Sequence, residues 1–345
     1  MKYTIAVSGI NAVDNPGPGT GIAQSLKESD LDVRIIGLAY DAMEPGIYMD
    51  DLIDRSYIVP YPSGDLESYI NRIRYIHAKE KIDVLIPTLD AELPLYIKKE
   101  QVLKSMGIKM MIPEKVAYRK REKDNLREIA ENTGLVVPRT ITVTSEAEVS
   151  EAVKELGLPA MVKGPFYEAF KTDSVIEAVH HFHSLAAKWG FPVIVQEYVT
   201  GDEVNLVGLG DGEGGEMGHL AIKKMLITKL GKVWINVSIK NQKIEDAAKK
   251  LVSYLRWKGG FELELIYNNK SDVYYLIEIN PRFPAWVYMA SGCGINLPQR
   301  MVKRLMGLSC ETHSHYKAGK LMVRYTSEII KDISDFEKMT TIGEN

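Results

Sequence analysis

The first 112 residues alternate between short runs of β-branched or apolar residues and longer stretches with helical periodicity. Strands are predicted at residues 4–8, 33–38 and 83–87, and helices near residues 22–27 and 66–79. Strands that alternate with helices in this way favour a parallel, doubly wound sheet. We therefore predict an α/β lobe over residues 1–112.

The rest of the chain predicts two further lobes and an extension. Residues 113–198 are read as a small α+β lobe, with elements at 122–133, 140–143, 146–156, 160–163, 174–188 and 193–198. Residues 199–320 are mainly strands, at 203–210, 218–224, 232–237, 261–267 and 273–279, with one helix at 244–257. Residues 321–345 are polar and weakly patterned, and form either a docking strand or a ragged end.

Composition narrows the class of protein. The 345 residues are 45% hydrophobic and 26% charged, with a net charge of −3, so no basic field is available to bind nucleic acid or an anionic membrane. No apolar run approaches the roughly 18–20 residues that cross a bilayer, and the first residues lack the apolar core of a signal peptide. Two cysteines, Cys293 and Cys310, make no disulfide framework. We expect a cytoplasmic protein, either monomer or homodimer.

Acidic residues concentrate in two late strands. Residues 261–267 (FELELIY) and 274–283 (YYLIEINPRF) are joined by a short loop. Because side chains alternate along a strand, Glu262 and Glu264 share one face of the first strand, and Glu278 and Asn280 share one face of the second. An antiparallel hairpin would bring Glu264 beside Glu278, and oxygen ligands of this kind suit Mg²⁺. The alternative is a hairpin with solvated acids on its exposed face.

The stretch GFELELIYNNKSDVYYLIEINPRF resembles the metal-binding end of ATP-grasp enzymes of the carbamoyl-phosphate-synthase and biotin-carboxylase type. The resemblance implies an ATP-grasp fold behind the N-terminal doubly wound lobe. It also implies that Glu264, Glu278 and Asn280 hold Mg²⁺, or Mn²⁺ in its place, against the phosphates of ATP. Glu262 competes with Glu264 for the first ligand position. Arg282 becomes a catalytic contact to substrate or phosphate.

Four more segments resemble the family in the same order. Residues 122–138 resemble the helix that opens the fold, 159–163 a phosphate-binding strand, 196–203 the hinge between lobes, and 221–234 a strand pair that supplies another cation. The resemblance assigns Lys123, Lys163 and Lys224 to phosphate, with Lys224 also catalytic, Gln196, Glu197 and Val199 to adenine, and Glu203 to ribose. The physical logic is that ATP carries about four negative charges, which must be neutralised and aimed for phosphoryl transfer.

One segment departs from the family. Residues 164–171 (GPFYEAFK) occupy the place of a flexible glycine-rich loop, but they contain one glycine and three aromatic residues. Such a loop cannot wrap phosphate with successive backbone amides. We expect Lys171 to substitute as a point charge.

Other candidate residues carry weaker signals. The loop at residues 17–21 lacks G-x-G-x-x-G spacing, so a glycine turn is favoured over a dinucleotide site. Asp90 and Glu92 follow a strand at the carboxyl edge of the sheet, where they either bind an amine or are loop acids. His180, His181 and His183 lack the spacing of a zinc site. Cys293 is read as a packing residue, and Trp286 either lines a substrate pocket or packs in the core.

These observations predict an ATP-dependent ligase that joins a small-molecule or peptide carboxylate to an amine, or to a thiol, through an acyl phosphate. Two alternatives stay open. One is a nucleotide-binding regulatory module that has lost catalysis, which the altered loop favours. The other is a nicotinamide-dependent oxidoreductase built on the N-terminal glycine loop.

Overall fold

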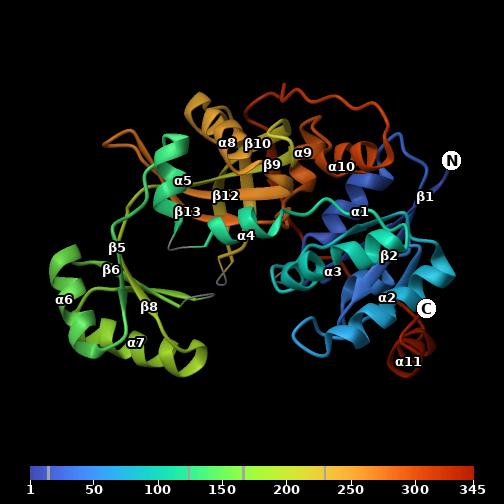
Figure 1. The fold of residues 1–345 in the computed structure, drawn as a ribbon, viewed down its shortest axis with the longest axis horizontal. Helices are drawn as coiled ribbons and strands as arrows, with labels where there is room; N and C mark the ends of the chain where they lie inside the picture. Colours follow the sequence, from blue (N-terminus) through green and yellow to red (C-terminus); the bar gives the residue numbers. More distant parts are fainter. Residues whose placement is uncertain (14–15, 123–124, 165–167, 229–230) are drawn as a thin grey trace. The chain divides into compact units, whose positions relative to one another are not determined.

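The computed structural model describes residues 1–13, 16–122, 125–164, 168–228 and 231–345 (Figure 1). The chain forms two compact units. The first contains residues 1–121, 204–263 and 279–345, and the second contains residues 122–203 and 264–278. No helix in the described part of the chain is both long and apolar enough to span a bilayer. The division into three consecutive lobes stays a prediction.

A four-stranded parallel sheet forms the N-terminal part of the first unit. Its order is β3 (Arg55–Ile58), β2 (Val33–Ala39), β1 (Tyr3–Ser8) and β4 (Val84–Ile86). Ile5 and Val7 face a core shared with α1 (Gly19–Lys27), whereas Ala6 faces α2 (Leu66–Glu80) and α3 (Leu93–Ser105). Helices therefore cover both faces, which confirms the predicted doubly wound sheet. The sequence pattern missed β3 and α3.

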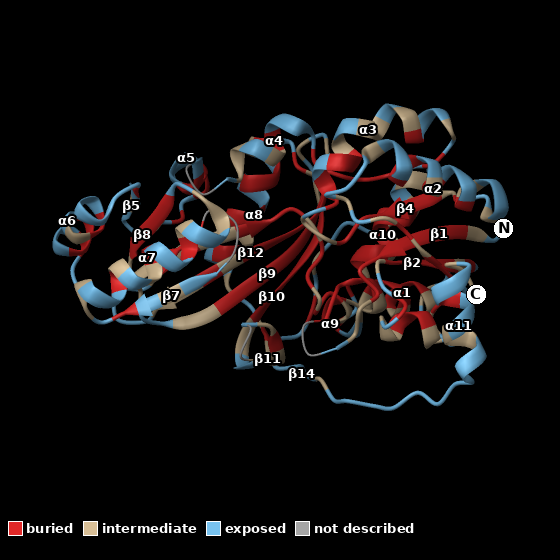
Figure 2. Ribbon diagram, turned by 90° about the horizontal axis from the view of Figure 1, so that it is seen from below, coloured by how far each residue is buried: buried red, intermediate tan, exposed pale blue. Residues whose placement is uncertain are grey.

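A six-stranded sheet follows, in the order β13-β12-β9-β10-β11-β14. Its strands are β9 (Asp202–Asp211), β10 (Glu216–Ile227), β11 (Val233–Ile239), β12 (Lys258–Asn268), β13 (Val273–Asn280) and β14 (Leu321–Val323). Within the first unit, Val207 and Leu220 from this sheet join the same apolar core as α9 (Tyr288–Gly292) and α10 (Leu297–Met306). Much of β9, β10 and β12 is buried, whereas β14 is mostly exposed (Figure 2). Helix α8 (Gln242–Leu255) buries only one side.

The C-terminal extension is a docked segment. Strand β14 pairs with β11, and α11 (Ile333–Thr341) leads to a last turn that reaches β3. There the amide of Ile58 donates to the Gly343 carbonyl (2.9 Å), and the amide of Ser56 donates to Asn345 Oδ1 (2.7 Å). Of the two readings of residues 321–345, the docking strand is therefore confirmed.

The second unit contains an antiparallel sheet in the order β5 (Thr140–Val143), β8 (Val193–Glu197), β6 (Ala160–Lys163) and β7 (Ala169–Thr172). Helices α6 (Glu146–Leu156) and α7 (Val175–Trp189) pack on one face of it. Ser145 and Ser174 cap these two helices, each accepting from an amide three residues on. Helix α5 (Leu126–Thr133) ends at the predicted residue, and Gly134 after it takes the left-handed conformation.

Candidate functional site

The face of the small sheet away from α6 and α7 opens on a cavity of about 390 Å³. Residues from β5, β6, β8, β13 and the start of α5 line it: Leu126, Arg127, Val137, Pro138, Thr140, Thr142, Lys163, Ile194, Gln196, Leu276 and Ile277. The walls are mixed, with apolar side chains beside Arg127, two threonines, Lys163 and Gln196, and the last two are each 9% exposed. Gln196 Nε2 donates to Thr140 Oγ1 (2.9 Å) across β5 and β8. A pocket in which polar groups are fixed among apolar side chains is typical of a small-ligand site.

Strand alternation explains why Gln196 lines this cavity. Val193 and Val195 on β8 point into the core beneath α6 and α7, so Ile194 and Gln196 face the opposite side. Glu197, the next residue, does not line the cavity. Its carboxylate accepts from Arg139 Nε (2.8 Å), and its amide donates to the Arg139 carbonyl (2.9 Å).

The lysines predicted for phosphate lie in different surroundings. Lys163 ends β6 opposite Ala169. Lys171 lies on β7, with Nζ 3.1 Å from Asp173 Oδ1 and 5.3 Å from the centre of the Tyr198 ring. The expectation that residues 164–171 are entirely loop is wrong, because residues 169–172 pair with β6 and Phe170 packs against the core of the lobe. Lys123 and residues 165–167 lie outside the described residues.

The remaining hinge and metal candidates are placed by their strands. Glu203 lies on β9 and Val199 precedes it, both half-buried. Lys224 is on β10, opposite Asn236. Glu264 on β12 and Glu278 on β13 are half-buried, whereas Asn280 is buried at the end of β13. Among the described residues no group of three or more His, Cys, Asp or Glu is arranged to hold a metal, which does not bear on a set of two carboxylates and one amide.

A buried polar cluster surrounds Glu262 in the first unit. Glu262 Oε1 accepts from Asn205 Nδ2 and from Trp286 Nε1, each at 2.7 Å. Its Oε2 accepts from Asn280 Nδ2 (3.0 Å) and lies 3.5 Å from Arg282 Nη1. The side chain is 4% exposed. Trp286, read from the sequence as a pocket or core residue, is therefore a core residue with its indole N–H fixed on this carboxylate.

Arg282 links this cluster to the N-terminal sheet. Its Nε donates to Asp90 Oδ2 (3.1 Å), and its Nη2 lies 3.3 Å from Asn280 Oδ1. Asp90 follows β4 at the carboxyl edge of the parallel sheet, where α/β proteins place ligands. The NPR segment is thus tied to the edge of the sheet by an ion pair.

Glu92 does not belong to a ligand site. It is fully buried and accepts from Ser8 Oγ (2.6 Å), from the amides of Thr88 and Leu89 (both 3.1 Å) and from the Tyr40 hydroxyl. Burial raises the pKa of this carboxyl above its ordinary value. The hypothesis that Glu92 binds an amine is wrong, because the side chain satisfies the lobe's own backbone.

The N-terminal glycines have a packing role. A Cβ on Gly17 would lie 2.2 Å from the Gly9 carbonyl oxygen, and one on Gly19 would lie 2.3 Å from the Ser8 carbonyl oxygen. The Gly19 amide donates to the Gly9 carbonyl (2.9 Å). This close backbone approach accounts for the glycines as a turn against β1.

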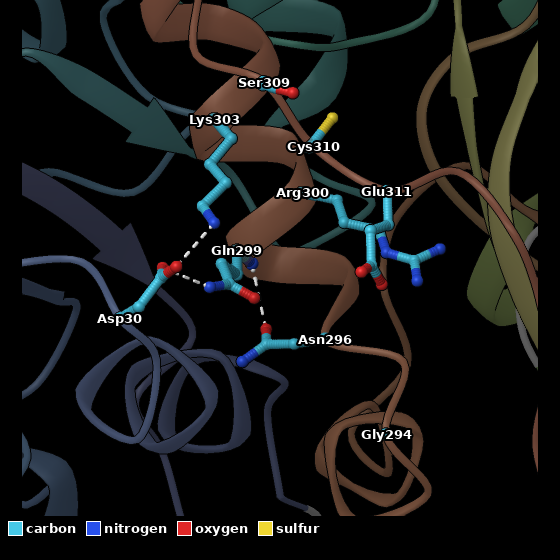
Figure 3. A pocket seen from close by; sticks show the side chains of 9 residues that line it. All are labelled: Asp30, Gly294, Asn296, Gln299, Arg300, Lys303, Ser309, Cys310 and Glu311. Carbon is cyan, nitrogen blue, oxygen red and sulfur yellow. Dashed lines mark hydrogen bonds and ion pairs between the residues drawn. The ribbon is translucent and has the colours of Figure 1, made fainter.

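A second cavity, of about 360 Å³, lies beside α10 (Figure 3). Its charges compensate one another: Lys303 Nζ is 2.8 Å from Asp30 Oδ2, and Gln299 Nε2 donates to Asp30 Oδ1 (2.5 Å). Arg300 donates to the carbonyls of Met217 and His313, both at 2.8 Å. None of the residues predicted for nucleotide or metal lines this cavity.

The histidines and Cys293 carry no site in the described structure. His183 contacts Glu146, and His181 stacks on Phe170 with ring centres 4.5 Å apart. Burial and the neighbouring His180 lower the pKa of His181. Cys293 is buried, which raises the pKa of its thiol and makes it less reactive.

Comparison with known proteins identifies a family domain within the chain. Residues 120–285 match the model of the ATP-grasp domain. The chain is 29% identical over 171 residues to the N-terminal section of the carbamoyl phosphate synthase large chain of Aquifex aeolicus, which is 48% of this chain and 28% of that protein. The chain therefore spans little more than a quarter of this curated relative.

Solved structures share the fold. The biotin carboxylase domain of 2-oxoglutarate carboxylase from Hydrogenobacter thermophilus superposes with a TM-score of 0.70 at 15% identity, over 92% of this chain and 73% of that one. L-amino acid ligase from Bacillus licheniformis gives a TM-score of 0.64 at 16% identity, over 88% and 74%. Residues 120–285 thus match the ATP-grasp domain by sequence, and the chain shares the ATP-grasp fold of these solved structures.

Proposed function

We propose that this protein is an ATP-dependent ligase that activates a carboxylate as an acyl phosphate and transfers it to an amine or a thiol. The observation that carries the proposal is the cavity on the small sheet, where buried Gln196 and Lys163 lie in one wall together with apolar side chains. This cavity lies within the segment that matches the ATP-grasp domain. An adenine ring needs an apolar slot with a few polar groups at its edge, and the phosphates need a cation nearby.

The further nucleotide contacts come from the resemblance to ATP-grasp enzymes. Gln196 and Val199 would bind adenine and Glu203 would bind the ribose, whereas Glu197 lies outside the cavity and pairs with Arg139. Lys163 and Lys171 would bind phosphate from the small sheet, with Lys123 and Lys224 as further cations. Lys171 would have to exchange its contact with Asp173 for phosphate, because Asp173 and Tyr198 already contact it. Unchanged ATP affinity and turnover in Lys171→Ala would remove it from the set.

The residues present fit a divalent metal. Glu264, Glu278 and Asn280 supply hard oxygen ligands, as Mg²⁺ prefers, and the amide of Asn280 is already held by Glu262. When bound, Mg²⁺ or Mn²⁺ would offset negative charge on the phosphates. The 2-oxoglutarate carboxylase domain was solved with MgADP and bicarbonate.

The proposed reaction has two steps. A carboxylate oxygen forms a bond to the γ-phosphorus while the bond from that phosphorus to the β–γ bridging oxygen breaks, giving an acyl phosphate and ADP. The amine nitrogen then bonds to the acyl carbon, the bond to phosphate breaks, and the nitrogen loses a proton. Arg282, which already contacts Asp90, Glu262 and Asn280, is the candidate for a positive charge beside the substrate carboxylate or the transferred phosphate.

A screen for ADP tests the proposal. The purified protein is incubated with Mg·ATP and pairs of amino acids, peptides and other small acids and amines, and ADP, phosphate and product mass are measured. ADP formation that requires both an acid and an amine supports the ligase. ATP binding without turnover for any pair favours the regulatory module, and binding of NAD(H) without ATP binding would favour the oxidoreductase. Sedimentation of the same sample tests the homodimer.

A further inference from the structure

Two of the groups around Glu262 can only donate hydrogen bonds to it. The indole N–H of Trp286 and the guanidinium of Arg282 have no acceptor. Trp286 Nε1 lies 2.7 Å from Oε1, and Arg282 Nη1 lies 3.5 Å from Oε2. Each carboxylate oxygen therefore faces a group that can donate a hydrogen bond but cannot accept one. Glu262 is thus placed as a hydrogen-bond acceptor on both sides.

This fixes the two amides that also face it. A side-chain amide can turn either its oxygen or its NH₂ toward a neighbour, but a carboxylate accepts only from NH₂. Asn205 follows this rule even at a cost. Its Nδ2 donates to Glu262, while its buried Oδ1 has no hydrogen-bond partner among the described residues. Asn280 obeys the same rule, with Nδ2 on Glu262 and Oδ1 turned away toward Arg282.

We propose that Glu262 is a positioning residue, which sets the orientation of the Asn280 amide so that its carbonyl oxygen, and not its NH₂, is presented to the metal. The inference rests on the proposed function. It also separates Glu262 from Glu264: Glu262 is 4% exposed with both oxygens engaged, so it does not ligate the ion itself. Groups that orient metal ligands typically contribute 10- to 100-fold in metal affinity.

A nearly isosteric change should reverse the orientation. In Glu262→Gln, the remaining oxygen is retained by Trp286 and Asn205, so the new NH₂ faces Asn280. The Asn280 amide is then driven to turn its oxygen toward residue 262, although this sets its NH₂ against the Arg282 guanidinium that now donates to Oδ1. Both orientations are strained, so the carbonyl oxygen is no longer held in place, and an amide NH₂ in that position is not a ligand for a hard cation.

A second change should restore the site. In Glu262→Gln with Asn280→Asp, the NH₂ of residue 262 donates to one oxygen of the new carboxylate, and the other oxygen is left for the metal. Asn280→Asp alone should be defective, because it sets one carboxylate against another in a buried position. Each single variant is therefore expected to bind metal worse than the pair combined.

The readout is direct metal binding. The affinity for Mn²⁺ is measured by electron paramagnetic resonance in the presence of a non-hydrolysable ATP analogue, and the affinity for the analogue without metal is measured alongside. We expect at least a tenfold loss of Mn²⁺ affinity in Glu262→Gln and in Asn280→Asp, recovery to within about threefold of wild type in the double variant, and little change without metal. The control Trp286→Phe removes one donor but leaves the Glu262–Asn280 bond, so it should lose less than Glu262→Gln.

The outcomes separate the two proposals. Wild-type Mn²⁺ affinity in Glu262→Gln, or a double variant no better than Asn280→Asp, overturns the positioning role while Glu278→Gln still reports the metal site. A wild-type protein that binds neither Mn²⁺ nor the analogue overturns the proposed function and the positioning role together. If Glu262→Gln does not fold by circular dichroism, the comparison of Asn280→Asp with the double variant decides the question.

Discussion

Lys163 offers the sharpest test of where the phosphates bind. Its side chain is 9% exposed at the end of β6 and lines the cavity on the small sheet. The change Lys163→Met keeps most of the apolar stem and removes the charge. A hydrogen bond to a charged group contributes about 1.5–3 kcal/mol, and each 1.4 kcal/mol is tenfold in affinity. We therefore expect ATP to bind about 10- to 150-fold more weakly.

Calorimetry with ATP and with adenosine separates this effect from general damage. Adenosine should occupy the same cavity without phosphates, so we expect its affinity to change by less than about threefold. Lys154→Met on the exposed face of α6 is a matched control for loss of one positive charge. Equal losses for ATP and adenosine, or an ATP affinity within threefold of wild type, would refute the assignment of Lys163 to phosphate.

Three further predictions concern other parts of the molecule. Glu278→Gln should lower ADP formation by about a thousandfold, roughly 4 kcal/mol at about 1.4 per decade, since it weakens the proposed metal site; a loss below tenfold would contradict the metal role. Burial raises the pKa of Glu92, so folding favours its protonated form, and this contribution is fully present below about pH 4.3 and is lost as pH rises through the folded-state pKa. Urea unfolding at pH 4.5, 6 and 7.5 should show wild type losing stability relative to Glu92→Gln as pH rises, and a constant difference would count against this. Gly17→Ala places a Cβ 2.2 Å from the Gly9 carbonyl oxygen, so thermal unfolding should reveal a loss of about 1–3 kcal/mol, whereas an unchanged melting temperature would show that the turn can move.

The sequence pattern predicted those elements whose own residues show clear periodicity or a capping residue. β5, α6 and β6 lie at their predicted residues, because α6 is amphipathic and starts at a serine cap. β7 was missed, since its pairing with β6 compensates for a segment whose composition resembles a loop. Strand propensity at such a site depends on the partner strand, which sequence spacing does not reveal.

For the candidate site too, the sequence identified candidate residues but could not distinguish between their roles. Alternation correctly grouped Glu262 with Glu264, but it could not tell them apart because both face one side of β12. The distinction comes from donors far along the chain, Asn205 and Trp286, which bury Glu262. Likewise Glu92 looked like a loop acid at a sheet edge, and only the fold brings Tyr40 and Ser8 onto it.

The central claim is that acids from the late hairpin and cations from the small sheet serve one nucleotide. A crystal structure with Mg²⁺ and a non-hydrolysable ATP analogue tests it most directly. We predict adenine in the cavity beside Gln196, a phosphate oxygen within hydrogen-bonding distance of Lys163 Nζ, and Mg²⁺ bound by Glu264, Glu278 and Asn280. A nucleotide bound elsewhere, or a metal held by other residues, would contradict the account.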